Sequence, residues 1–134
     1  MKYRIGVFVL TILSLVTVGW AAELCQHDLM VRGGAVYLAM RGDIGAGNLE
    51  AAELKARELV DVSREIQYLW VTQNTNWQVD DGVEWAQDSH QKSIELLKIL
   101  EEGDLDAAGA ALQETGQACG ACHQKYRPAR RTRQ

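Results

Sequence analysis

The sequence contains little of what a sheet protein or a nucleic-acid-binding protein needs. Its 134 residues include one proline, Pro128, and one phenylalanine, and no useful length of chain alternates apolar with polar residues. A half-buried strand needs that alternation, so we expect no strands. The 14 Lys and Arg residues are outnumbered by 18 Asp and Glu. A surplus of negative charge argues against nucleic acid as a partner.

Cysteine is also scarce, and its number is odd. Three cysteines cannot all pair within one chain, so a disulfide-based scaffold is a poor explanation for them. Cys119 and Cys122 are separated by two residues, and His123 follows directly in the stretch "CGACH". Cys25 stands far from this group in the sequence. We expect Cys25 to be a small, partly buried side chain, with an intermolecular disulfide as the alternative.

The first 22 residues differ from the rest of the chain. "MKYR" supplies two positive charges, a mostly apolar run "IGVFVLTILSLVTVGW" follows, and small residues come next in "AAE". This order is typical of a signal peptide, so we expect residues 1–22 to be cleaved after export to the periplasm. The alternative is an uncleaved membrane anchor, for which the run is short of the roughly 20 residues needed. Without Lys2 and Arg4, the mature chain has a net charge of −6.

The remaining chain is rich in helix-forming residues, and its apolar residues recur at intervals of three and four. That spacing predicts four amphipathic helices, at residues 23–41, 49–71, 83–101 and 105–127. A polar connection, "TQNTNWQVDDG", separates the second helix from the third. Short links between the other helices favour an all-α fold, an antiparallel four-helix bundle over residues 23–127. Residues 128–134 form a basic C-terminal tail after Pro128.

The stretch "CGACH" lies on the inward face of the fourth predicted helix. The intervals of three and four place Cys119, Cys122 and His123 on one side of that helix. A redox dithiol would need its first cysteine at a helix N-terminus, but a full helical pattern precedes Cys119. A zinc site would need four ligands, with Cys25 or His27 completing the set. Covalent haem explains every element, because two thiols can form thioethers with the haem vinyl groups while the histidine binds iron.

The C-terminal segment also resembles a known family. "EEGDLDAAGAALQETGQACGACHQKYR", residues 101–127, is similar to the last helix of the class II c-type cytochromes, which include cytochrome c′ and cytochrome c-556. "AMRGDIGAGNLEAAELKARELV", residues 39–60, resembles the family's first loop and second helix. The resemblance implies a four-helix bundle carrying one covalent haem c per chain, with His123 as the proximal iron ligand. It also implies that Arg127 lies near the haem, although a cation at a helix C-terminus explains this residue equally.

The resemblance leaves the sixth iron ligand open, since the first helix supplies the residue on that side. An apolar residue there implies a five-coordinate haem that admits small gases, whereas a methionine implies an electron carrier. Met30 is our candidate, because Gly33 and Gly34 follow it on one side of the helix. Adjacent glycines in a helix are costly, so we interpret them as a shallow face against a flat ligand. The alternative is that Met30 fills the core and the glycines let two helices pack closely.

Three other residues compete for this position. His27 would give a haem with two histidine ligands, and Leu29 would leave the iron open. Met40 lies further along the helix and is expected to be too distant.

The predicted function is single-electron transfer through the haem, with redox proteins as partners and no enzymatic chemistry. The alternative is a five-coordinate protein that binds NO or CO. The resemblance also implies a possible homodimer, and contact with a membrane is expected only if residues 1–22 are retained. Trp70, Trp77 and Trp85 are expected to cap the open end of the bundle, with covering of the haem edge as the alternative. His90 is expected to be solvated.

Overall fold

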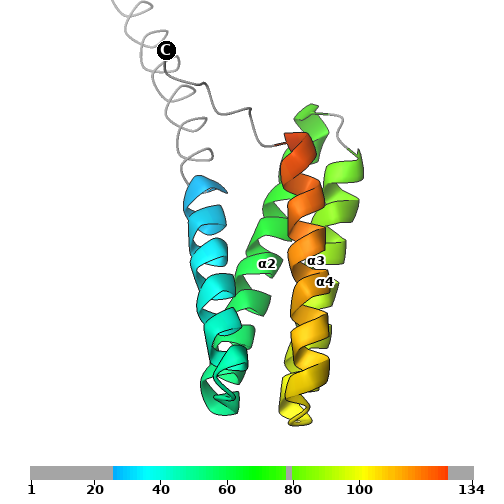
Figure 1. Cartoon of the computed structure of the whole chain (residues 1–134). Coiled ribbons are helices and arrows are strands. Elements are labelled where there is room, and N and C mark those ends of the chain that lie inside the picture. Colours follow the sequence, from blue (N-terminus) through cyan, green and yellow to red (C-terminus); the bar gives the residue numbers. More distant parts are fainter. Residues whose placement is uncertain (1–25, 78–79, 127–134) are drawn as a thin grey trace, which may run out of the picture.

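The computed structural model describes residues 26–77 and 80–126, and these form an antiparallel four-helix bundle (Figure 1). The described part of the first helix spans residues 26–45. The others are α2 (Leu49–Trp77), α3 (Asp80–Glu101) and α4 (Leu105–Tyr126). The all-α prediction is therefore confirmed. The predicted signal peptide (1–22), Cys25, Arg127 and the tail (128–134) lie outside the described residues.

Two turns of the same design close one end of the bundle. Gly47 adopts φ 74°, and its amide donates to the Ile44 carbonyl at 3.1 Å. The next amide, that of Asn48, donates to the Asp43 carbonyl at 2.9 Å. This pair of bonds is the Schellman motif, which satisfies the last carbonyls of a helix and favours glycine at the left-handed position. Gly103, with φ 80°, ends α3 in the same way.

The residue after each of these glycines precedes the next helix directly. Asn48 precedes α2, and its carbonyl accepts the Ala52 amide at 3.0 Å. Asp104 precedes α4, and its side-chain oxygen accepts the Ala107 amide at 2.9 Å, which is the geometry of an N-cap. Each reversal therefore needs only a few residues, which keeps neighbouring helices antiparallel and adjacent.

The buried residues match the predicted inward face of α4 more closely than that of α3. In α4, Ala108, Leu112, Thr115 and Cys122 are buried, as the spacing predicts, and Ala118 is buried beside the half-buried Cys119. In α3, the innermost positions are Ser93, Leu96 and Leu100, while Ile94 is 39% exposed. The apolar spacing of the third predicted helix puts Ile94, Leu97 and Leu100 on its inward face, with Leu96 and Ile99 beside them. This prediction is wrong at Ile94, because the inward face is centred on Leu96.

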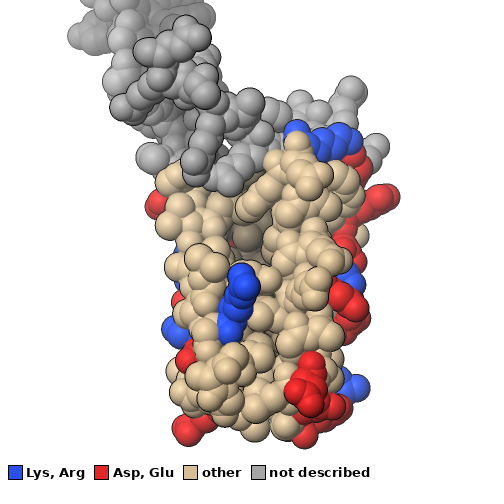
Figure 2. Space-filling model, viewed as in Figure 1, with Lys and Arg blue, Asp and Glu red and all other residues tan. Residues whose placement is uncertain are grey.

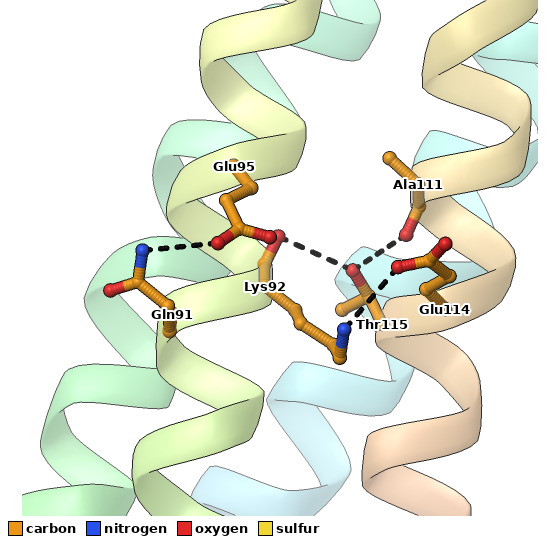
Figure 3. Close-up of polar contacts among 6 residues, drawn as sticks. All are labelled: Gln91, Lys92, Glu95, Ala111, Glu114 and Thr115. Atoms are coloured by element: carbon orange, nitrogen blue, oxygen red, sulfur yellow. Dashed lines mark hydrogen bonds and ion pairs between the residues drawn. The ribbon is translucent and has the colours of Figure 1, made fainter.

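Thr115 is a polar residue that is wholly buried between α3 and α4 (Figure 3). Its hydroxyl donates to the Ala111 carbonyl at 2.9 Å and lies 3.4 Å from the Lys92 carbonyl. At the surface beside it, the Lys92 ammonium pairs with the Glu114 carboxylate at 3.3 Å. The buried hydroxyl is therefore satisfied, as a buried polar group must be.

The polar connection predicted between the second and third helices is mostly helical. α2 continues to Trp77 and α3 begins at Asp80, so only residues 78–79 separate them. Extending an existing helix needs no new nucleation, and each poor helix former costs less than about 1 kcal/mol. Thr72 is accommodated because its hydroxyl lies 2.9 Å from the Tyr68 carbonyl and 3.1 Å from that of Leu69. Helix propensity alone therefore underestimated the length of both α2 and α3.

Candidate functional site

A hollow opens between the helices at the end of the bundle where α4 ends. Its volume is about 730 Å³ when all the space out to its open mouth is counted, and the centre of a water-sized sphere can reach about 120 Å³ of this. Figure 2 shows it between the first helix and α4, on a face where few side chains are charged. All four helices contribute to its lining, and representative residues are Met30, Gly34, Trp70, Trp85, Cys119 and His123.

The wall formed by α4 carries the three residues of the "CGACH" stretch. Cys119, Cys122 and His123 all line the hollow. Cys122 is buried, Cys119 is half-buried and His123 is exposed, so the group runs from the interior to the rim. No disulfide joins the two cysteines. The helix therefore brings together the residues that the sequence analysis grouped on one face.

The two thiols are in surroundings that suppress the thiolate form. Burial raises the pKa of the Cys119 thiol, and a hydrogen bond with Ser89 offsets only part of that rise. Burial also raises the pKa of the Cys122 thiol, helped by the nearby Cys119 and Asp81. A redox dithiol needs a lowered thiol pKa. These surroundings therefore argue against dithiol chemistry.

The opposite wall of the hollow comes from the first helix. Met30, Gly33 and Gly34 all line it, together with Tyr37. The two glycines differ in what surrounds them. A Cβ atom on Gly33 would lie 3.2 Å from Cγ1 of Val62 in α2, whereas one on Gly34 would meet nothing within 4 Å. Close helix packing therefore explains Gly33, and Gly34 leaves the space beside it open.

The rival candidates for the distal position lie elsewhere. The His27 side chain is 75% exposed, lies beside Asp28 and does not line the hollow. Leu29 is buried but is not part of the lining. Met40 is wholly buried within the main core. Of the candidates that the sequence analysis named, Met30 is the one that shares the hollow with His123.

Two tryptophans form much of the remaining wall. Trp70 and Trp85 both line the hollow, so they do more than cap the end of the bundle. The Lys125 ammonium lies 5.7 Å from the centre of the Trp85 ring and pairs with Asp81, which ties the start of α3 to the end of α4. Aromatic walls of this kind shield a flat ligand from water.

A polar contact behind the hollow was missed by the sequence analysis. Ser63 of α2 is buried and lines the hollow, and its hydroxyl lies 3.0 Å from the Val60 carbonyl and 2.9 Å from Nδ1 of His90 in α3. His90 is half-buried rather than solvated, so that expectation was wrong. Burial, followed by the charge of Arg64, lowers the pKa of His90. The two partners are 27 residues apart, and no local sequence signal joins them.

The residues of the hollow fit a covalently held haem. The hollow opens to the surface, its walls are mainly apolar and aromatic, two thiols and a histidine lie on one side, and a thioether faces them from another helix. Thiols beside an axial histidine are the donor set of a c-type haem site. The fold and the hollow together define a protein of the c-type haem class.

Comparison with protein families gives the same class and a narrower group within it. Residues 30–127 match the family model described as cytochrome c′. The match covers well over half of the chain, so the chain belongs to the cytochrome c′ family, whose proteins carry covalently attached haem c with its iron. No curated protein and no solved structure gives a significant match. Within the residues that the structure describes, no helix is long and apolar enough to cross a membrane.

Proposed function

We propose that this chain is a periplasmic electron carrier whose haem is bound by Cys119, Cys122 and His123, with Met30 as the sixth iron ligand. The haem supplies an iron that gains and loses one electron. The two cysteines hold it covalently to α4, and His123 occupies the proximal position. Redox proteins are its partners, and the chain performs no bond-making chemistry.

The observation that carries this proposal is that Met30 and His123 line the same hollow from different helices. Gly34 adds open space beside Met30, where a larger side chain would compete with a flat ligand. Trp70 and Trp85 exclude water from the other sides. A thioether ligand raises the reduction potential of a haem, which suits a carrier that accepts and releases electrons.

The five-coordinate alternative would use the same hollow with Met30 as a neighbour of the iron. Such a site would admit NO or CO at the open position. The observation that supports this alternative is that the hollow is open at its mouth. The two proposals therefore differ in one bond, from the Met30 sulfur to iron.

A matched pair of substitutions tests that bond. Met30→Leu and Met40→Leu both replace a methionine with a residue of similar volume, and such exchanges cost less than about 1.5 kcal/mol in a core. We expect Met30→Leu to convert low-spin iron to high-spin iron in the purified holo-protein. Met40→Leu should leave the absorption spectrum unchanged, because Met40 lies in the core away from the hollow. If both variants have the same spectrum as the parent, Met30 is not a ligand, and the gas-binding alternative gains support where the parental spectrum is itself high-spin.

The export step and the covalent bonds have separate tests. Mass spectrometry of the periplasmic protein should give a chain that begins after residue 22 and carries one haem. Replacing both Cys119 and Cys122 with alanine should abolish the covalent haem in a pyridine haemochrome assay. Haem that stays covalently attached in that variant would reject both cysteines as the attachment points.

A further inference from the structure

The first helix and α4 make a close contact beside the hollow. The Tyr37 hydroxyl donates a hydrogen bond to the Leu112 carbonyl at 3.2 Å, joining residues that are 75 positions apart. The Tyr37 side chain also lines the hollow. One side chain therefore forms part of the pocket wall and fixes that wall to the helix carrying Cys119, Cys122 and His123.

With the Tyr37 side chain in this position, a side chain at position 116 has no room. A Cβ atom there would lie 2.3 Å from the Tyr37 hydroxyl oxygen and 2.9 Å from Cζ of the same ring. Glycine inside a helix is unfavourable relative to alanine, so its presence calls for a structural reason. Gly109, two turns earlier in α4, meets nothing within 4 Å and has no such reason. Gly116 therefore lets the tyrosine approach the α4 backbone.

The contact lies about two helical turns from each of the two groups proposed to bind the iron, toward the same end of the bundle. Tyr37 is two turns after Met30 on the first helix, and Gly116 is two turns before His123 on α4. Helices are stiff over two turns, so a change in their separation at this contact is transmitted to Met30 and His123. Coordination tolerates displacements of only about 0.5 Å before the geometry is lost.

We propose that the Tyr37–Gly116 contact is a spacer that sets the separation of the first helix from α4, and thereby decides whether Met30 reaches the iron. Tyr37 is thus a positioning residue, and the proposal rests on the function proposed above. Keeping Met30 on the iron requires the two helices to stay close, whereas release of Met30 lets them part. A clash at the spacer therefore favours the released state.

The test compares Gly116→Ala with Gly109→Ala in the purified holo-protein. Both substitutions add one methyl group to α4, but only the first meets Tyr37. We expect Gly116→Ala to raise the ratio of high-spin to low-spin iron by about tenfold, because the clash destabilises the close arrangement. The rate of CO binding to reduced iron should rise in parallel. Gly109→Ala should match the parent in both measurements.

Two further variants separate positioning from general destabilisation. Tyr37→Phe keeps the ring but removes the hydrogen bond, and we expect a smaller change, about threefold, in the same direction. The double variant Tyr37→Phe/Gly116→Ala lacks the oxygen that makes the 2.3 Å contact. Its ratio of high-spin to low-spin iron should therefore be closer to the parental ratio than that of Gly116→Ala alone. A general loss of stability would give no such recovery.

The outcomes distinguish this proposal from the assignment of Met30. If Gly116→Ala keeps the parental spectrum and CO-binding rate, or if Gly109→Ala changes them equally, the spacer is rejected. If Met30→Leu shows that Met30 is not a ligand, the spacer is judged on CO binding alone. A faster rate in Gly116→Ala then supports it as the determinant of pocket width, and an unchanged rate rejects it. If Gly116→Ala does not fold, Tyr37→Phe decides by the same measurements.

Discussion

Gly82 at the start of α3 gives a direct test of how tightly the tryptophan wall is packed. A Cβ atom at this position would lie 2.5 Å from Cζ3 and 2.7 Å from Cε3 of Trp70. The atoms it meets belong to a rigid ring that lines the hollow, so relief requires movement of the whole side chain. Gly82→Ala should therefore be destabilising, although alanine favours a helix.

The size of the effect follows from two opposing contributions. Replacing glycine with alanine inside a helix stabilises it by about 1 kcal/mol, and overpacking a well-filled site costs about 1–3 kcal/mol. Gly109→Ala gains the first contribution without the second, because nothing lies within 4 Å of its added methyl group. We expect the free energy of unfolding of Gly82→Ala to be about 1–3 kcal/mol below that of Gly109→Ala.

Urea unfolding of the holo-protein, followed by far-UV circular dichroism, measures this difference. The double variant Trp70→Leu/Gly82→Ala provides the control, since the smaller side chain leaves room for the methyl group. In a double-mutant cycle, Gly82→Ala should cost less in the Trp70→Leu background than in the parent. Equal stabilities for Gly82→Ala and Gly109→Ala would refute the idea that the Trp70 ring rests on Gly82.

Three further predictions concern the core, a helix cap and pH. Leu96→Ala should lower the free energy of unfolding by about 2–5 kcal/mol because the side chain is wholly buried. Leu54→Ala, at a position 66% exposed, should change the free energy of unfolding by no more than about 0.5 kcal/mol. Similar losses for the two variants in urea unfolding would contradict the assigned core. Asp104→Ala should lower the free energy of unfolding by about 1 kcal/mol through loss of the N-cap of α4. Asp104→Asn should keep most of the parental stability, because asparagine also caps helices. Equal losses of stability in the two variants would argue against capping. The pKa of His90 is lowered from 6.5 in the folded chain, so the unfolded chain binds this proton more readily and stability falls as the pH drops below about 6.5. His90→Gln should reduce the fall in urea midpoint between about pH 7 and pH 5, and a fall as large as in the parent would show that His90 is not the group responsible.

The sequence predicted α4 well because its signals are local. Apolar residues at intervals of three and four fix which side of that helix is buried, and the same intervals place Cys119, Cys122 and His123 together. Asp104 and Gly103 likewise act on their immediate neighbours, so the turn before α4 could be predicted. The bundle fold follows from these local patterns.

The contacts that shape the hollow could not be predicted in the same way. The Tyr37 hydroxyl meets α4 across 75 residues, and Ser63 meets His90 across 27. Such pairs depend on how helices cross, and periodicity within one helix does not fix the crossing. Gly116 shows the difference, because it and Gly109 both lie within α4 and only the tertiary structure reveals Tyr37 beside Gly116.

The absorption spectrum of the reduced holo-protein, with and without carbon monoxide, tests the central claim most directly. Coordination of the iron by both His123 and Met30 predicts a sharp low-spin alpha band that carbon monoxide changes little or only slowly. A broad high-spin spectrum that shifts at once on adding carbon monoxide would contradict it and would identify an open, gas-binding haem.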